Sequence, residues 1–189
     1  MPAPQPSHRP GCISLEDCLH EIYYGQIRAG RFGKQTSQRF RVWKSKRLGL
    51  AYLDPFPSVE YESDSYRLSV NDSAGIEDYF CIHDAQQPGY LMQIQEFLNR
   101  GMVVADCGCG GGAMLDLLSG LTARTIAIEP FTGFHPSLRE RGHTVYSGLG
   151  AAIEREHGNV DLALSIHVIE HTADPIEYLT SVWQLLKAG

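Results

Sequence analysis

The sequence predicts an α/β fold with a doubly wound parallel sheet, preceded by a small β-containing module. From residue 76 onward, apolar runs typical of buried strands alternate with segments that have helical spacing. This pattern is typical of parallel strands joined by helical crossovers that cover both faces of a sheet. The earlier part differs in charge. Residues 1–50 hold nine Lys and Arg against three Asp and Glu, although the whole chain has a net charge of −6.

The N-terminal part is expected to contain a tail and a module. Residues 1–11 hold four prolines and no hydrophobic periodicity, which predicts a disordered tail. Residues 12–65 are expected to form the small basic module. Its candidate strands are residues 40–43 and 48–53, the second stopped by Asp54-Pro55, and together they predict a hairpin or ribbon.

Residues 66–189 are expected to form the larger domain, with a boundary near residues 60–75. A helix over residues 76–97, interrupted by Pro88-Gly89, precedes the first strand. The four expected strands are residues 102–107, 124–129, 143–146 and 160–166. The later helices are expected at residues 113–118, 136–141, 151–157 and 175–187. We expect the sheet to stop after about four strands, with the fourth as an uncovered edge open to oligomer formation.

A glycine turn follows the first predicted strand, in the stretch Asp106-Cys107-Gly108-Cys109-Gly110-Gly111-Gly112. Glycines at alternate positions let the backbone turn tightly and approach a ligand closely. A helix start after such a turn favours a pyrophosphate, but an acid before the turn suits a ligand with a positive charge, such as an amino group. The candidate cofactor-binding residues here are Asp106, Gly108, Cys109, Gly110 and Gly112.

Glu129 ends the second predicted strand, 23 residues after Asp106. A carboxylate at this place offers two acceptor oxygens to the two hydroxyls of a ribose. The turn also fits the pattern G-x-G-x-x-A. A dinucleotide-binding oxidoreductase therefore remains an alternative.

Residues from about 76 to 189 resemble the first half of a class I S-adenosylmethionine-dependent methyltransferase, which has a Rossmann-like fold. The matching segments are the glycine turn, Ile128-Glu129-Pro130, residues 160–165, residues 167–171 and residues 185–189. The resemblance implies S-adenosylmethionine as the cofactor, with Asp106 near its ammonium group and Glu129 on its ribose. It implies that Ser165 and Ile166 border the reacting methyl group. The adenine would be held by backbone groups or by Ser147, because the usual acid after the third strand is absent here.

Members of this family have seven strands, whereas about four are expected in this chain. A truncated or non-catalytic cofactor-binding module is therefore the alternative to an enzyme. His167-Val168-Ile169-Glu170-His171 also matches the zinc-protease pattern H-x-x-E-H, but the first histidine falls at a strand end instead of on a helix. Similar ubiquinone-pathway methyltransferases hold a divalent ion with Glu-x-x-Glu-His, where this chain has His167. Simple packing of the loop is the third interpretation. We expect no metal site, and His167 is the candidate catalytic base.

The acceptor and the location follow from weaker signals. Gly49-Leu50-Ala51-Tyr52-Leu53-Asp54-Pro55 resembles the end of a Cys-rich ribbon found in some bacterial polysaccharide-cluster methyltransferases, although Cys12, Cys18 and His20 are too few for a zinc site. A sugar hydroxyl is therefore the first expected acceptor. RNA or an acidic partner is the second, because Arg31 to Arg47 holds seven basic residues and no acid. We expect a cytoplasmic protein, since no apolar run approaches the roughly 20 residues of a membrane span.

Overall fold

The computed structural model describes residues 5–11, 13–14, 16–29, 34–56, 80–81 and 83–188. The chain divides into two compact units. The first comprises residues 1–60 with 173–177, and the second comprises residues 61–172 with 178–189. Residues 60–75, where the sequence places the domain boundary, lie outside the described residues, as do Cys12 and Arg31.

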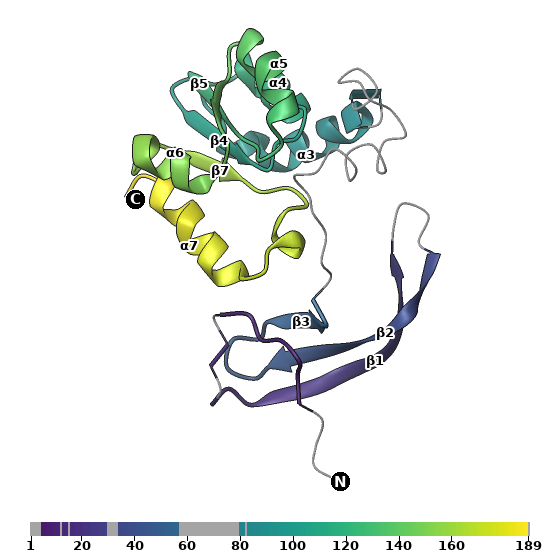
Figure 1. The fold of residues 1–189 in the computed structure, drawn as a ribbon. Coiled ribbons are helices and arrows are strands. Elements are labelled where there is room, and N and C mark those ends of the chain that lie inside the picture. The colour runs from purple at the N-terminus through teal and green to yellow at the C-terminus, as the bar shows by residue number, and fades with distance from the viewer. Residues whose placement is uncertain are drawn as a thin grey trace. The chain divides into compact units, whose positions relative to one another are not determined.

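The first unit contains an antiparallel sheet in the order β1-β2-β3 (Figure 1). Its strands are β1 (Leu19–Ala29), β2 (Lys34–Ser45) and β3 (Ala51–Asp54). β2 contains the predicted strand 40–43, and β3 overlaps the predicted strand 48–53 at residues 51–53. The two strands pair with each other, as expected of a hairpin or ribbon. β1 was not predicted. Its sequence lacks the clean apolar–polar alternation of a half-buried strand. In the structure, two register shifts break its pairing with β2.

The core of the first unit gathers around Trp43, which is buried with Ile13 and Tyr52. The indole Nε1 of Trp43 donates a hydrogen bond of 3.1 Å to Asp54. The backbone N–H of Ser7, from the segment expected to be a tail, donates to the same carboxylate at 2.8 Å. Burial opposes ionisation of Asp54, but these hydrogen bonds outweigh it and hold the pKa of Asp54 below its usual value.

The second unit is built on a four-stranded sheet in the order β6-β5-β4-β7. Its strands are β4 (Val103–Cys107), β5 (Arg124–Ile128), β6 (Thr144–Tyr146) and β7 (Leu162–Leu164). All three strand pairs are parallel, so the predicted α/β fold with a parallel sheet is confirmed. β4 comes first in sequence yet lies inside the sheet, with β5 on one side and β7 on the other.

Helices cover both faces of this sheet (Figure 1). The helices are α3 (Gln87–Ile94), α4 (Ala113–Ser119), α5 (His135–Glu140), α6 (Leu149–Glu156) and α7 (Pro175–Leu185). Successive residues of β4 point to opposite faces. Val104 packs with α3 and α4, and Ala105 packs with α6 and α7. No helix in the described part of the chain is both long enough and apolar enough to cross a membrane.

The helix expected over residues 76–97 is interrupted directly before Pro88-Gly89 and not at that pair, because a 3-10 turn (Asp84–Gln86) precedes α3, which begins at Gln87. Pro88 lies in the first turn of α3, and the helix continues through Gly89 to Ile94. A proline is accommodated in the first turn because the N–H that it lacks would have no partner inside the helix. Residues 76–79 of the predicted helix lie outside the described residues.

Two adjacent leucines of α4 provide a test of this packing. Leu118 is 0% exposed and Leu117 is 39% exposed. We expect Leu118→Ala to lower the free energy of unfolding by about 2–5 kcal/mol, because it leaves a cavity between α4 and the sheet. Leu117→Ala, the matched control, should cost less than about 1 kcal/mol. Urea unfolding followed by circular dichroism measures both, and equal losses would contradict the packing described.

Candidate functional site

The predicted cofactor-binding residues meet at one edge of the parallel sheet, where its strands end. The glycine turn follows β4, Glu129 follows β5, Ser147 follows β6, and Ser165 follows β7. These carboxyl ends lie together because the strands are parallel. β5, the next strand in sequence, pairs with one side of β4, and β7, the last strand, pairs with the other side. Ligands of open α/β sheets bind at such a switch point.

The glycine turn holds a backbone conformation that only glycine adopts easily. Gly108, Gly110 and Gly112 have φ angles of +79°, +55° and +87°. A Cβ atom at Gly108 would lie 2.5 Å from Cγ2 of Val168, closer than packing allows. The N–H of Gly108 donates to the carbonyl of Ile128 at 2.7 Å, so the turn is also fastened to the end of β5.

Glu129 is the best anchored acid of the site and is only 1% exposed. Its Oε2 accepts a hydrogen bond of 2.8 Å from the N–H of Gly110, and its Oε1 accepts one of 2.9 Å from the N–H of Phe131. Its backbone carbonyl accepts a hydrogen bond of 2.7 Å from Nε2 of His135. A carboxylate oxygen can accept more than one hydrogen bond, so these contacts are compatible with a further one from a ligand hydroxyl.

Asp106 lies at the end of β4 and is 5% exposed. Burial, and secondly the negative charge of Glu129, raise the pKa of Asp106 to about 7. Two neighbouring buried carboxylates disfavour each other's ionisation. A positively charged ligand group would relieve this cost, whereas an anion would increase it.

The two cysteines of the turn are not suited to nucleophilic chemistry. Burial raises the pKa of Cys107 to about 12 and raises that of Cys109 well above its ordinary value. Both thiols therefore stay protonated near neutral pH. The side chain of Cys109 packs in the core with Leu115 and Leu138, so any contact it makes with a cofactor would use its backbone.

The residues after β7 have a polar partner that the sequence did not indicate. Ser165 is exposed, and its hydroxyl forms a hydrogen bond of 2.8 Å with the hydroxyl of Tyr178 on α7. Burial raises the pKa of Tyr178 to about 12, so this phenol stays protonated. Ile166 packs against the cluster of Val104 and Leu164.

His167 follows these residues and has a φ of +54° without being glycine. Its Nε2 lies 2.9 Å from the hydroxyl of Tyr90 on α3, and its Nδ1 lies 3.3 Å from Oε1 of Glu170. Strained backbone of this kind occurs often at functional sites. Among the described residues, no group of three or more His, Cys, Asp or Glu side chains could hold a metal ion.

Three groups in contact with the site were not anticipated from the sequence: His135, Tyr178 and Tyr90. His135 lies only six residues after its partner Glu129. Tyr90 and Tyr178 reach their partners through the fold, since Tyr90 is 77 residues from His167 and Tyr178 is 13 residues from Ser165. A single sequence carries no spacing signal for such pairs. Tyr90 lies in the helical pattern before the first predicted strand, and that pattern is equally consistent with a core residue.

The raised pKa of Asp106 makes a prediction about stability in the absence of ligand. The folded state keeps the Asp106 proton up to about pH 7, whereas the unfolded state loses it near the ordinary carboxyl pKa of 3.8. The stabilising contribution of Asp106 is thus complete below about pH 4 and is lost as the pH rises through about 7. Relative to Asp106→Asn, the wild-type chain should lose a few kcal/mol of unfolding free energy over this range.

Urea unfolding at several pH values measures this difference. Asp161→Asn is the control. The pKa of Asp161 is lowered by hydrogen bonds from Lys187 and Val103, so this variant should leave the slope between about pH 5 and pH 8 unchanged. If the plots of unfolding free energy against pH were parallel for the wild-type chain and Asp106→Asn, the pKa of Asp106 would not be raised, contrary to this prediction.

The comparisons with known proteins agree with this geometry. The family model of a methyltransferase domain matches residues 83–189. A ubiquinone biosynthesis O-methyltransferase of Ruegeria sp. (strain TM1040) is 34% identical over 97 residues, which are 47% of this chain and 38% of that protein. One from Dinoroseobacter shibae is 33% identical over 100 residues, which are 48% of this chain and 39% of that protein. The chain spans about two fifths of the length of these curated relatives.

Among solved structures, similarity extends to a methyltransferase from Thermotoga maritima described as S-adenosylmethionine-dependent and as a possible histamine N-methyltransferase. The two chains are 26% identical with a TM-score of 0.48. The match covers 60% of this chain and 52% of that one.

Proposed function

This chain belongs to the class I S-adenosylmethionine-dependent methyltransferases, and we propose that it binds that cofactor at the carboxyl edge of its parallel sheet for methyl transfer to a hydroxyl oxygen. The observation that carries the proposal is the buried pair of carboxylates, Asp106 and Glu129. S-Adenosylmethionine has an ammonium group and a sulfonium group, both positive. These positive charges match the acidic site, and the hydroxyls of the ribose can donate hydrogen bonds to the carboxylate of Glu129.

The proposed roles of the side chains follow their places at the edge. The ammonium group would meet Asp106, and the ribose would meet Glu129, whose orientation is fixed by the N–H groups of Gly110 and Phe131. Ser147 is proposed for the adenine. Ser165 and Ile166, after β7, are proposed to border the methyl group.

A dinucleotide fits this site less well. The pyrophosphate of NAD would bring two negative charges to the glycine turn beside Asp106, which is buried, so solvent would screen the repulsion poorly. Glu129 would hold a ribose in either case, so it does not discriminate between the two ligands. The charge of the site therefore favours methyl transfer over the oxidoreductase alternative.

A hydroxyl acceptor is supported by the curated relatives, which are named for O-methylation in ubiquinone biosynthesis. The names of these relatives point to no sugar, so a sugar hydroxyl is supported only by the sequence resemblance. The RNA expectation gains less support, because two basic residues of that stretch already have acidic partners. Arg41 pairs with Glu21, and Arg47 pairs with Asp17.

The cofactor supplies a methyl group made electrophilic by the sulfonium, and the electrons of the broken carbon–sulfur bond remain on sulfur. The protein then has to align the acceptor and take up the hydroxyl proton. His167 is the proposed base. It lies after β7, and the next residue, Val168, lies against Gly108 of the turn. Glu170 is within reach of the Nδ1 of His167 and can stabilise the imidazolium that forms.

Calorimetry with S-adenosylmethionine and S-adenosylhomocysteine tests the cofactor site. We expect the wild-type chain to bind both in the micromolar range. Glu129→Gln should weaken binding by about 10–100-fold, because a charged acceptor is lost. Glu154→Ala, which removes an exposed acid of α6, is the control and should bind normally. Folded wild-type protein that gives no heat with either compound would refute the proposal.

Formation of S-adenosylhomocysteine with phenolic and monosaccharide acceptors tests the role of His167. His167→Asn keeps a residue that tolerates the left-handed backbone but removes the imidazole. We expect turnover to fall by about 10²–10⁴-fold with cofactor affinity unchanged. His157→Ala, an exposed histidine after α6, is the control. Normal turnover of His167→Asn would exclude it as the base, and cofactor binding without turnover in the wild-type chain would favour the non-catalytic alternative.

A further inference from the structure

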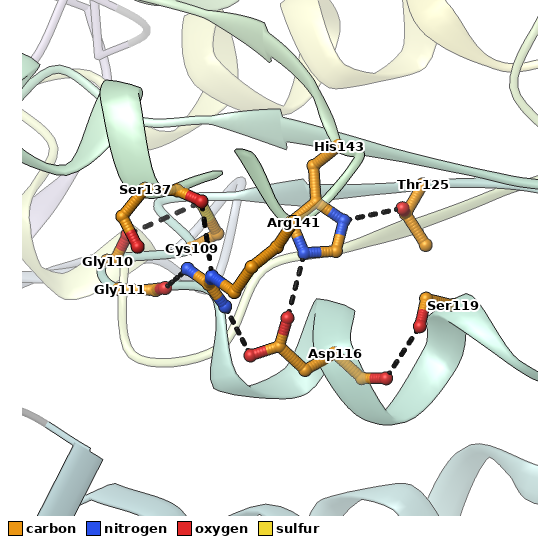
Figure 2. A network of polar contacts seen from close by, with 9 residues as sticks. All are labelled: Cys109, Gly110, Gly111, Asp116, Ser119, Thr125, Ser137, Arg141 and His143. Atoms are coloured by element: carbon orange, nitrogen blue, oxygen red, sulfur yellow. Dashed lines mark hydrogen bonds and ion pairs between the residues drawn. The ribbon is translucent and has the colours of Figure 1, made fainter. Parts of the chain in front are cut away.

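A polar network lies beside the glycine turn and reaches Gly111 of that turn (Figure 2). Its centre is Arg141, which directly follows α5. The guanidinium donates one hydrogen bond to the backbone carbonyl of Gly111 and another to Oδ2 of Asp116 on α4. Its Nε donates to the carbonyl of Ser137 at 3.2 Å. Arg141 thus joins the turn, α4 and α5.

The network continues into the sheet through Asp116. Its Oδ1 accepts a hydrogen bond of 2.9 Å from Nε2 of His143, which is buried at the start of β6. The Nδ1 of His143 lies 2.8 Å from the hydroxyl of Thr125, which is buried on β5. Arg141 is therefore held by a partner that is itself fixed to two strands, as Figure 2 shows.

The turn needs such a support because of its composition. Gly110, Gly111 and Gly112 are consecutive, and glycine loses more conformational freedom on ordering than any other residue. The N–H of Gly110 is held by Glu129 on the ligand side. The carbonyl of Gly111 is held by Arg141 on the other side. A turn ordered before the ligand arrives does not have to be ordered by the binding energy.

We infer that Arg141 is a positioning residue for the cofactor turn, which it preorganises through Gly111 without touching the ligand. Arginine suits this task because its planar fork donates to a carbonyl and a carboxylate at the same time. The inference rests on the proposed cofactor site.

Three variants test it: Arg141→Ala, Arg141→Lys and Arg139→Ala. Lysine keeps the positive charge and the aliphatic stem but lacks the fork. Arg139 is exposed on α5, and its replacement makes the same change of charge two residues away. The readouts are the Kd for S-adenosylhomocysteine, the hydrogen exchange of the peptide covering residues 106–116 without ligand, and the melting temperature.

We expect Arg141→Ala to raise the Kd about tenfold or more, with Arg141→Lys in between and Arg139→Ala unchanged. Within that peptide, exchange should become faster at residues 108–116, while the strands β4 and β5 keep their protection. The Lys variant decides the matter if the Ala variant does not fold. A wild-type Kd and wild-type exchange in Arg141→Lys would overturn the inference, as would faster exchange throughout the domain with a matching fall in melting temperature.

Failure of the cofactor proposal has a different signature. In that case the wild-type chain gives no binding, whereas the local change in hydrogen exchange of the Arg141 variants still reports on the support of the turn. Unchanged exchange in both Arg141 variants would overturn the inference even then.

Discussion

The site depends on two carboxylates buried side by side where β4 and β5 end. Burying Asp106 and Glu129 together is unfavourable unless each finds compensation. Glu129 finds it in the backbone N–H groups of Gly110 and Phe131, and this ties the course of the glycine turn to the acid of the next strand. Asp106 is compensated less, as its raised pKa shows. The turn, the neighbouring strand and the charge preference of the ligand all follow from this one arrangement.

The parallel sheet was predictable because its inner strands β4 and β5 are almost wholly buried and appear as largely apolar runs, whereas β6 and β7 are mostly half-buried. Each of β4 to β7 lies within its expected range, and the helices between them differ from expectation by a few residues at their ends. β1 was missed for a physical reason. Ile22, Tyr23 and Tyr24 are consecutive and all exposed, and a register shift interrupts the pairing there, so the sequence shows no alternation of buried and exposed positions that would mark a strand.

The gathering of the candidate site residues at one edge was also predictable, because parallel strands bring their carboxyl ends together whatever the loops do. The partners that orient the site residues were not. Arg141 meets Gly111 across 30 residues of sequence, and Tyr90 meets His167 across 77. Such contacts depend on how α3 and α5 pack on the sheet. No local spacing in the sequence encodes that packing, so an isolated arginine after a helix predicts only a solvated charge.

The contact between Val168 and Gly108 couples two segments that are distant in sequence. Any side chain at position 108 would meet the Cγ2 atom of Val168 and would also bear the strain of a φ of +79°. Shortening Val168 removes the first cost but not the second, which is about 1–2 kcal/mol. Substitutions at positions 108 and 168 are therefore epistatic: a smaller residue at 168 partly rescues alanine at 108. The loop after β7 thereby limits which sequences the turn after β4 can sample in evolution.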